Sequence, residues 1–108
     1  MLRRFLVERH IRGIGTWAAA DLAETARRSN AALAKLSGVQ WQQSFVARDR
    51  SFCIYLADSE AVIREHARFA GLPIERIVEI PTLFDPTSEL RCARPRAGLA
   101  SAPAAVTD

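Results

Sequence analysis

The sequence has two cysteines, one lysine and no long apolar run, and these shortages exclude whole classes of protein. Cys53 lies inside a short apolar run, and Cys92 lies among Pro, Arg and Ala residues. Such placement does not suit a disulfide framework and favours a reducing compartment. No apolar stretch reaches the length of a signal-peptide core or a membrane helix. We therefore expect a cytoplasmic protein with no membrane partner.

Other absences narrow the function. The loop after the first predicted strand, "HIRGIGTW", lacks the C-x-x-C of a metallochaperone, and "GIG" is too short for a phosphate-binding loop. The strand "RSFCIYL" lacks the glycine and exposed aromatics of an RNA-recognition motif. The formal net charge of +3 is spread along the chain, so we expect no nucleic-acid partner. An N-terminal group of arginines is expected to be a solvated edge: Arg3, Arg4, Arg9 and Arg12.

The first half of the chain predicts a strand followed by a helix. Residues 3–10 alternate, with Phe5 and Val7 on one side and Glu8 and His10 on the other. Apolar residues then recur at helical spacing over about 18–36. Thr16 is a candidate N-cap for this helix, and Gly38 supplies its C-terminal stop.

The middle of the chain predicts a β-hairpin. If Asp49-Arg50 is a two-residue turn, then Phe45 lies opposite Ile54. One face of the hairpin is then apolar, and we expect it to pack under the helices with Phe5 and Val7. Its members are Phe45, Ala47, Phe52, Ile54 and Leu56. The more polar face has Gln42, Ser44, Val46, Cys53 and Tyr55.

The remaining elements complete an α+β fold. Asp58 or Ser59 caps a second helix that ends at Gly71, and residues 74–82 form a last strand that Pro81 restricts to a sheet edge. The order β-α-β-β-α-β predicts a ferredoxin-like sandwich, an antiparallel sheet of order 4-1-3-2 with two helices on one face. We expect this domain over residues 1–87 and a flexible Pro/Ala/Arg-rich tail over 88–108. A core this small favours covering the open sheet face or an edge strand with a second copy, as a homodimer.

The predicted open face gathers metal-ligand types. Glu8 and His10 are two residues apart on one strand, about 7 Å along it, and Cys53 is expected beside them on the third strand. Carboxylate, imidazole and thiolate suit nickel or a similar divalent transition metal, so we predict a metal site of Glu8, His10 and Cys53, or of Glu8 and His10 with a residue from a partner chain.

Plainer alternatives stay open for each of these residues. Glu8 and His10 fit a solvated strand end with ion pairs, and Cys53 fits a small buried hydrophobe. His66 occupies the apolar stripe of the second helix and fits a neutral structural histidine bonded to backbone. A second function is a dimeric α/β-barrel enzyme or ligand binder, with His66 or His10 as general base and Tyr55 and Ser44 on a small substrate.

Several segments also resemble a known family. "RFLVERHIRGIGTW", "VQWQQSFV", "EHARFAGLP" and "DPT" are similar to a bacterial domain-of-unknown-function family that includes a ferredoxin-like, homodimeric nickel-binding protein. The resemblance spans about residues 3–87. It implies a ferredoxin-like fold, a dimer and surface nickel sites, and it assigns no ligand residues.

Overall fold

The computed structural model describes residues 1–91 of the chain. The order of the main elements is the predicted one, with a short 3-10 turn η1 between β1 and α1 and a short α3 after β4. The elements are β1 (Arg3–His10), η1 (Ile14–Thr16), α1 (Ala19–Leu33), β2 (Val39–Val46), β3 (Arg50–Ala57), α2 (Glu60–Ala70), β4 (Arg76–Glu79) and α3 (Ser88–Arg91). Of the predicted tail, residues 88–91 form α3, and Cys92 with the rest lies outside the described residues. No helix within residues 1–91 is long and apolar enough to cross a membrane.

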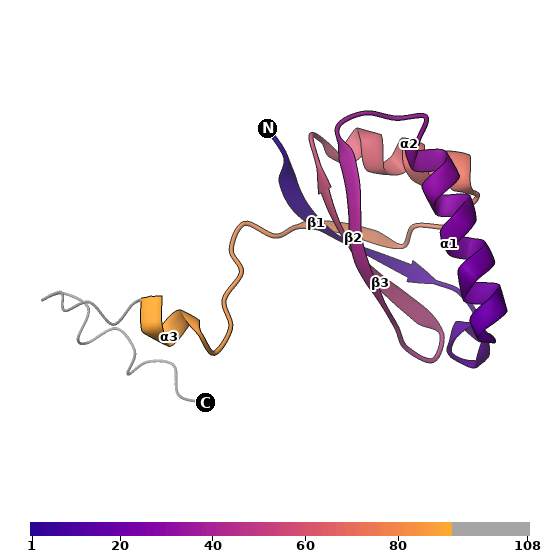
Figure 1. The fold of residues 1–108 in the computed structure, drawn as a ribbon, viewed down its shortest axis with the longest axis horizontal. Coiled ribbons are helices and arrows are strands. Elements are labelled where there is room, and N and C mark those ends of the chain that lie inside the picture. Colours follow the sequence, from indigo (N-terminus) through magenta and orange to yellow (C-terminus); the bar gives the residue numbers. More distant parts are fainter. Residues whose placement is uncertain (92–108) are drawn as a thin grey trace, which may run out of the picture.

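The four strands form one antiparallel sheet in the order β2-β3-β1-β4. This is the predicted ferredoxin-like arrangement, and the short β4 lies at an edge, as expected for a strand that runs into Pro81. Figure 1 shows α1 and α2 together on one face of the sheet, whereas the chain after β4 leads away from it to α3. Residues 1–91 therefore leave the opposite sheet face uncovered.

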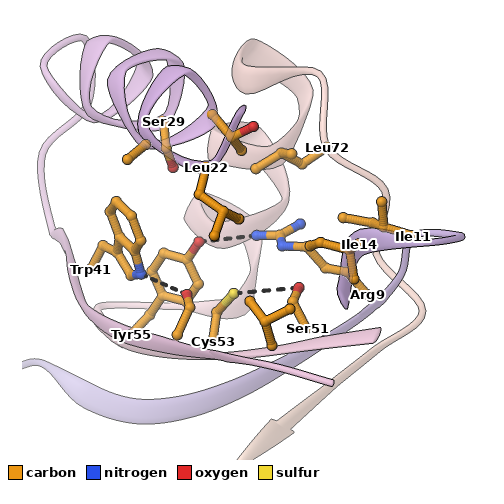
Figure 2. Close-up of a pocket in the computed structure, with 14 residues that line it drawn as sticks. Arg9, Ile11, Ile14, Leu22, Ser29, Trp41, Ser51, Cys53, Tyr55 and Leu72 are labelled. Atoms are coloured by element: carbon orange, nitrogen blue, oxygen red, sulfur yellow. Dashed lines mark hydrogen bonds between the residues drawn. The ribbon is translucent and has the colours of Figure 1, made fainter. Parts of the chain in front are cut away.

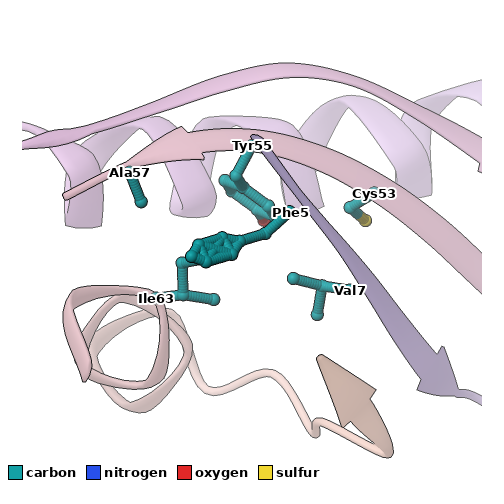
Figure 3. Close-up of a cluster of buried hydrophobic side chains, with 6 residues drawn as sticks. All are labelled: Phe5, Val7, Cys53, Tyr55, Ala57 and Ile63. Atoms are coloured by element: carbon teal, nitrogen blue, oxygen red, sulfur yellow. The ribbon is translucent and has the colours of Figure 1, made fainter. Parts of the chain in front are cut away.

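The core lies between the sheet and the helices, and it corrects one prediction. Phe5 and Val7 are buried on the helix side, as expected, but their partners across β3 are Tyr55 and Cys53. Figure 3 shows these four side chains packed with Ile63 of α2. The prediction that Phe52, Ile54 and Leu56 pack under the helices is wrong, because β3 turns its smaller and more polar set inward.

The hairpin turn is displaced from the predicted place by one residue. Ala47 N–H donates to the Arg50 carbonyl at 2.8 Å, and Val46 pairs with Ser51, so Arg48 and Asp49 form the turn. Phe45 therefore lies opposite Phe52 and not Ile54. This shift moves the pairing by two residues, which leaves Phe45 on the same face as Phe52 and Ile54.

Helix ends agree with the sequence only in part. Ser59 caps α2 by accepting from Val62 N–H at 3.3 Å, and Gly71 ends that helix with a φ of 71°. At the start of α1, however, the Asp21 carboxylate accepts from Ala18 N–H at 3.2 Å. Thr16 does not cap α1, because its hydroxyl donates to the Gly13 carbonyl within η1.

Gly15 supports the junction between η1 and the hairpin. Its N–H donates to the Arg48 carbonyl at 2.8 Å, and a Cβ at this position would lie 2.7 Å from the Ala47 carbonyl oxygen and 2.9 Å from Arg48 Cα. Gly15→Ala should therefore lower the free energy of unfolding by about 1–3 kcal/mol, since backbone atoms must move. Urea unfolding would measure this, and Arg12→Ala on the exposed side of the same loop should change stability by less than about 0.5 kcal/mol. Equal effects of the two substitutions would contradict the predicted clash.

Candidate functional site

The open sheet face has a cluster of charges at the end of β1. Glu8 accepts from two arginines, with Oε2 at 3.0 Å from Arg50 Nη1 and Oε1 at 3.1 Å from Arg76 Nη2. Arg50 also pairs with Glu75 at 2.9 Å. We call Glu8, Arg50, Glu75 and Arg76 the Glu8 cluster. Both carboxylate oxygens of Glu8 are therefore paired within the chain, and only 14% of its side chain is exposed.

His10 lies at the edge of this cluster, and Cys53 does not. His10 is exposed and pairs with Arg50 across the sheet, on the same side of β1 as Glu8. Cys53 is buried opposite Val7 on the helix side, where its Sγ is 3.9 Å from Ser51 Oγ. The prediction that Cys53 and Tyr55 share a face with Glu8 and His10 is therefore wrong, because successive side chains of a strand alternate between faces.

The residues of this face fall short of the requirements of a metal ion. The described part of one chain contains no group of three or more His, Cys, Asp or Glu side chains placed to hold a metal. Glu8 already neutralises Arg50 and Arg76, and His10 is the one imidazole on this face. A nickel site made by the described residues of a single chain therefore does not fit the structure.

A pocket of about 280 Å³ lies on the other side of the sheet, between α1 and the helix-facing residues of β1, β2 and β3. Figure 2 shows Arg9, Ser51, Cys53 and Tyr55 on the sheet side of the pocket and Leu22 and Ser29 on the side of α1. Trp41 lines it and donates from Nε1 to Ser44 Oγ at 2.9 Å. Small side chains such as Ala26 and Ser29 leave this space open beneath α1.

Arg9 is the charged residue of the pocket. Its side chain is 1% exposed, and it donates from Nη1 to the Pro73 carbonyl at 2.7 Å and from Nη2 to the Tyr55 hydroxyl at 3.0 Å. Arg9 Nε has no hydrogen-bond partner. The expectation that Arg9 belongs to a solvated basic edge is wrong. The signal that could have placed it was the alternation of β1, which puts Arg9 on the side of Phe5 and Val7.

His66 is enclosed in the layer between α1, α2 and the sheet. It is 0% exposed, and Nε2 lies 3.2 Å from both the hydroxyl and the carbonyl oxygen of Ser29, whereas Nδ1 has no partner. Burial lowers the pKa of His66 most strongly, with Arg9 adding to the effect. The ring is therefore neutral near pH 7, as predicted for a structural histidine. Neither His66 nor His10 lines the pocket, so the geometry places no general base there.

Comparisons with known proteins identify the family. A family model described as "Nickel responsive protein SCO4226-like" matches residues 5–80. The chain belongs to the SCO4226-like family. Among solved structures, the crystal structure of SCO4226 from Streptomyces coelicolor A3(2) aligns with a TM-score of 0.62 and 25% sequence identity, over 75% of this chain and 99% of that one. A search of the curated proteins found no match.

The SCO4226-like match extends from β1 to the end of β4. It therefore includes both regions described above, the Glu8 cluster with His10 on the open face and the Arg9 pocket under the helices. It ends before α3. The family description associates the domain with nickel. Which of its residues can bind an ion depends on the contacts that they already make.

Proposed function

We propose that this protein binds nickel or a similar divalent transition metal in the cytoplasm and works as a homodimer. The observation that supports this is membership of a nickel-responsive family over nearly the whole folded domain. The buried, unpaired thiol of Cys53 agrees with a reducing compartment. The proposed site lies on the open face, with His10 as its imidazole ligand and Glu8 beside it. Glu8 would have to release Arg50 or Arg76 to coordinate the ion.

A second chain is part of the proposal because one chain supplies too few ligands. Imidazole and carboxylate are suitable ligands for nickel, but an ion bound by His10 and Glu8 alone would keep most of its coordination positions in water. A second copy placed against the same face would bring another His10 and another Glu8. A two-fold interface repeats each residue, so it doubles the ligands near the axis without any new residue type.

The uncovered sheet face has the composition of an interface. We define the open-face patch as the apolar residues Leu6, Phe45, Phe52, Ile54, Leu56 and Val78. In the sheet register Val78, Leu6 and Ile54 are direct neighbours in one row, and Phe52 and Phe45 adjoin Glu8 in the next. Phe45 is 55% exposed and Val78 is 39% exposed in the single chain. An apolar centre edged by the charges of the Glu8 cluster is the usual anatomy of a protein interface.

Calorimetry tests the metal assignment. Untagged, metal-free protein titrated with nickel chloride should show stoichiometric binding, and His10→Ala should reduce the affinity at least tenfold or abolish the signal. Cys53→Ser should leave binding unchanged, because that side chain lies on the opposite face of the sheet. Glu8→Gln should weaken binding, whereas Glu79→Gln, a matched change on the neighbouring strand, should not. Absence of binding by wild-type protein, or full binding by His10→Ala, would refute the assignment.

A further inference from the structure

We propose that the Arg9 pocket binds a small carboxylate with an apolar body, with Arg9 and Tyr55 holding the carboxylate and the remaining walls enclosing the body. The site is separate from the proposed nickel site, because it lies on the opposite side of the sheet. The proposal depends on the charge of Arg9, the character of the walls and the size of the space.

Arg9 is a buried cation without a counterion in the described part of the chain. Its two hydrogen-bond acceptors, the Pro73 carbonyl and the Tyr55 hydroxyl, are both uncharged. Burial raises the pKa of Tyr55, so the phenol keeps its proton at neutral pH. No pocket-lining residue is acidic, and no carboxylate of residues 1–91 forms an ion pair with Arg9. A guanidinium keeps its charge in proteins, and burying it without an anion costs free energy that a bound carboxylate would recover.

The guanidinium has donors left for a ligand. Arginine carries five N–H donors in a planar fork that matches the two oxygens of a carboxylate. The two bonds to Pro73 and Tyr55 leave Nε without a partner although it is fully buried. Figure 2 shows Arg9 and Tyr55 meeting within the pocket, so that a ligand oxygen near Nη2 would also lie near the phenol.

The pocket walls determine which apolar body fits beside the carboxylate. They are mainly aliphatic and aromatic, with Ile11, Ile14 and Trp41 among them. An apolar cavity of roughly 150 Å³ accommodates benzene. A space of about 280 Å³ therefore admits a ring with a short acid side chain and excludes a nucleotide. Leu22 and Val46 line the pocket and are 38% and 44% exposed, so the pocket reaches the surface and a ligand can enter.

A singly charged anion matches the site better than a phosphate. The pocket offers one fixed positive charge, which balances one carboxylate and leaves a phosphate dianion half compensated in an apolar space. The other polar groups of the lining are hydroxyls, a thiol and an indole N–H, which carry no charge. We therefore infer an arylalkanoic or short-chain fatty acid as the chemical class.

The test compares 3-phenylpropionate with 3-phenylpropionamide on the wild-type protein. The two probes have nearly the same shape and differ in charge, so the acid should bind at least tenfold more tightly than the amide. The readout is the indole N–H signal of Trp41 in two-dimensional NMR, with Trp17 as internal control because it does not line the pocket. Equal affinities, or no shift of Trp41 with the acid at millimolar concentration, would overturn the proposal.

Two variants assign the effect to named atoms. Arg9→Met should lower the affinity for the acid at least tenfold and change the affinity for the amide by no more than about twofold. Arg4→Met, which removes the same charge from the other side of β1, should change neither. Tyr55→Phe removes a single hydroxyl and should lower the affinity for the acid several-fold. This variant keeps the assignment testable if Arg9→Met does not fold. If folded Arg9→Met still bound the acid more tightly than the amide, the role assigned to Arg9 would be wrong. If Tyr55→Phe bound the acid as tightly as the wild-type protein does, the role assigned to Tyr55 would be wrong.

Discussion

Ile54→Glu should convert the proposed dimer into a folded monomer. Ile54 lies in the middle of the open-face patch, on a central strand and beside Leu6. Its side chain faces away from the helices, so the substitution leaves the core of one chain intact. In a two-fold dimer the change places two carboxylates in the buried centre of the interface, without partners. Burying an unpaired charge costs several kcal/mol, so we expect association to weaken by at least a hundredfold.

Sedimentation and circular dichroism together measure this result. The wild-type protein should sediment at about twice the chain mass of 11.9 kDa, and the variant at the chain mass with an unchanged far-ultraviolet spectrum. Leu83→Glu is the matched control, because Leu83 is 63% exposed in the segment after β4 and outside the patch. A dimeric Ile54→Glu protein would exclude the open face as the interface and leave an edge strand as the alternative.

The same variant also tests the two-chain nickel site. If His10 and Glu8 of two copies are needed around one ion, then a monomeric Ile54→Glu protein should lose nickel binding while keeping both residues. A monomer that binds nickel as tightly as the wild-type protein would show that the ligands come from one chain. Binding of 3-phenylpropionate should survive in the monomer, because the Arg9 pocket lies on the helix side. The two proposed sites can therefore fail independently.

The order of the elements could be predicted because each one carries a local signal. The alternation in β1, the Ser59 cap and the Gly71 stop are properties of neighbouring residues, and Pro81 just after β4 indicates an edge position for the last strand. The ferredoxin-like arrangement then follows from chain connectivity. No alignment or long-range information is needed for these steps.

The inward face of β3 could not be predicted, because the structure buries the less hydrophobic of its two faces. Phe52, Ile54 and Leu56 are the more hydrophobic set, and hydrophobicity alone assigns them to the core. The structure buries Cys53, Tyr55 and Ala57 in their place. Smaller residues allow the helices to approach the sheet, and the buried Tyr55 hydroxyl finds Arg9 as a partner. Which face of β3 turns inward depends on tertiary packing. Because Cys53 lies on the inward face, it cannot belong to the predicted metal site on the open face.

Arg9 shows a conflict between two rules of sequence interpretation. The alternation of β1 places Arg9 on the buried side, whereas arginine is rarely buried without an ion pair. The second rule led to a solvated edge, and the first was correct. The pocket itself had no sequence signal, since a cavity results from how α1 packs over the sheet. For a charged residue at an inward strand position, strand alternation is therefore the stronger guide to burial.

Acid should destabilise this protein below about pH 6.5 through His66. In the unfolded chain the ring titrates near its ordinary pKa of about 6.5, and in the folded protein burial lowers the pKa. The stabilising effect of the neutral ring is therefore complete above pH 6.5 and is lost as the pH falls toward the folded-state pKa. In that range the free energy of unfolding should fall with a slope of at most about 1.4 kcal/mol per pH unit, the limit for one proton.

The surroundings of His66 explain why the charged form is unfavourable. Nδ1 has no acceptor, the Tyr55 ring lies 5.5 Å away, and the charged group nearby is the like-charged Arg9. Only the Ser29 carbonyl favours the protonated ring. Protonation of His66 therefore places two cations in one buried layer. The resulting change in the free energy of unfolding should be larger than that from protonating an exposed histidine.

Urea unfolding at pH 8, 7, 6 and 5 measures the slope. His66→Leu should remove most of the loss between pH 6.5 and 5, whereas His10→Ala should retain it, because His10 is exposed and is the only other histidine. Glu24 and Glu65, whose pKa values are lowered by hydrogen bonds from arginines, lose their contribution only at lower pH, below about 4.5. A wild-type stability that stays flat down to pH 5 would show that His66 meets solvent or an anion when it is protonated.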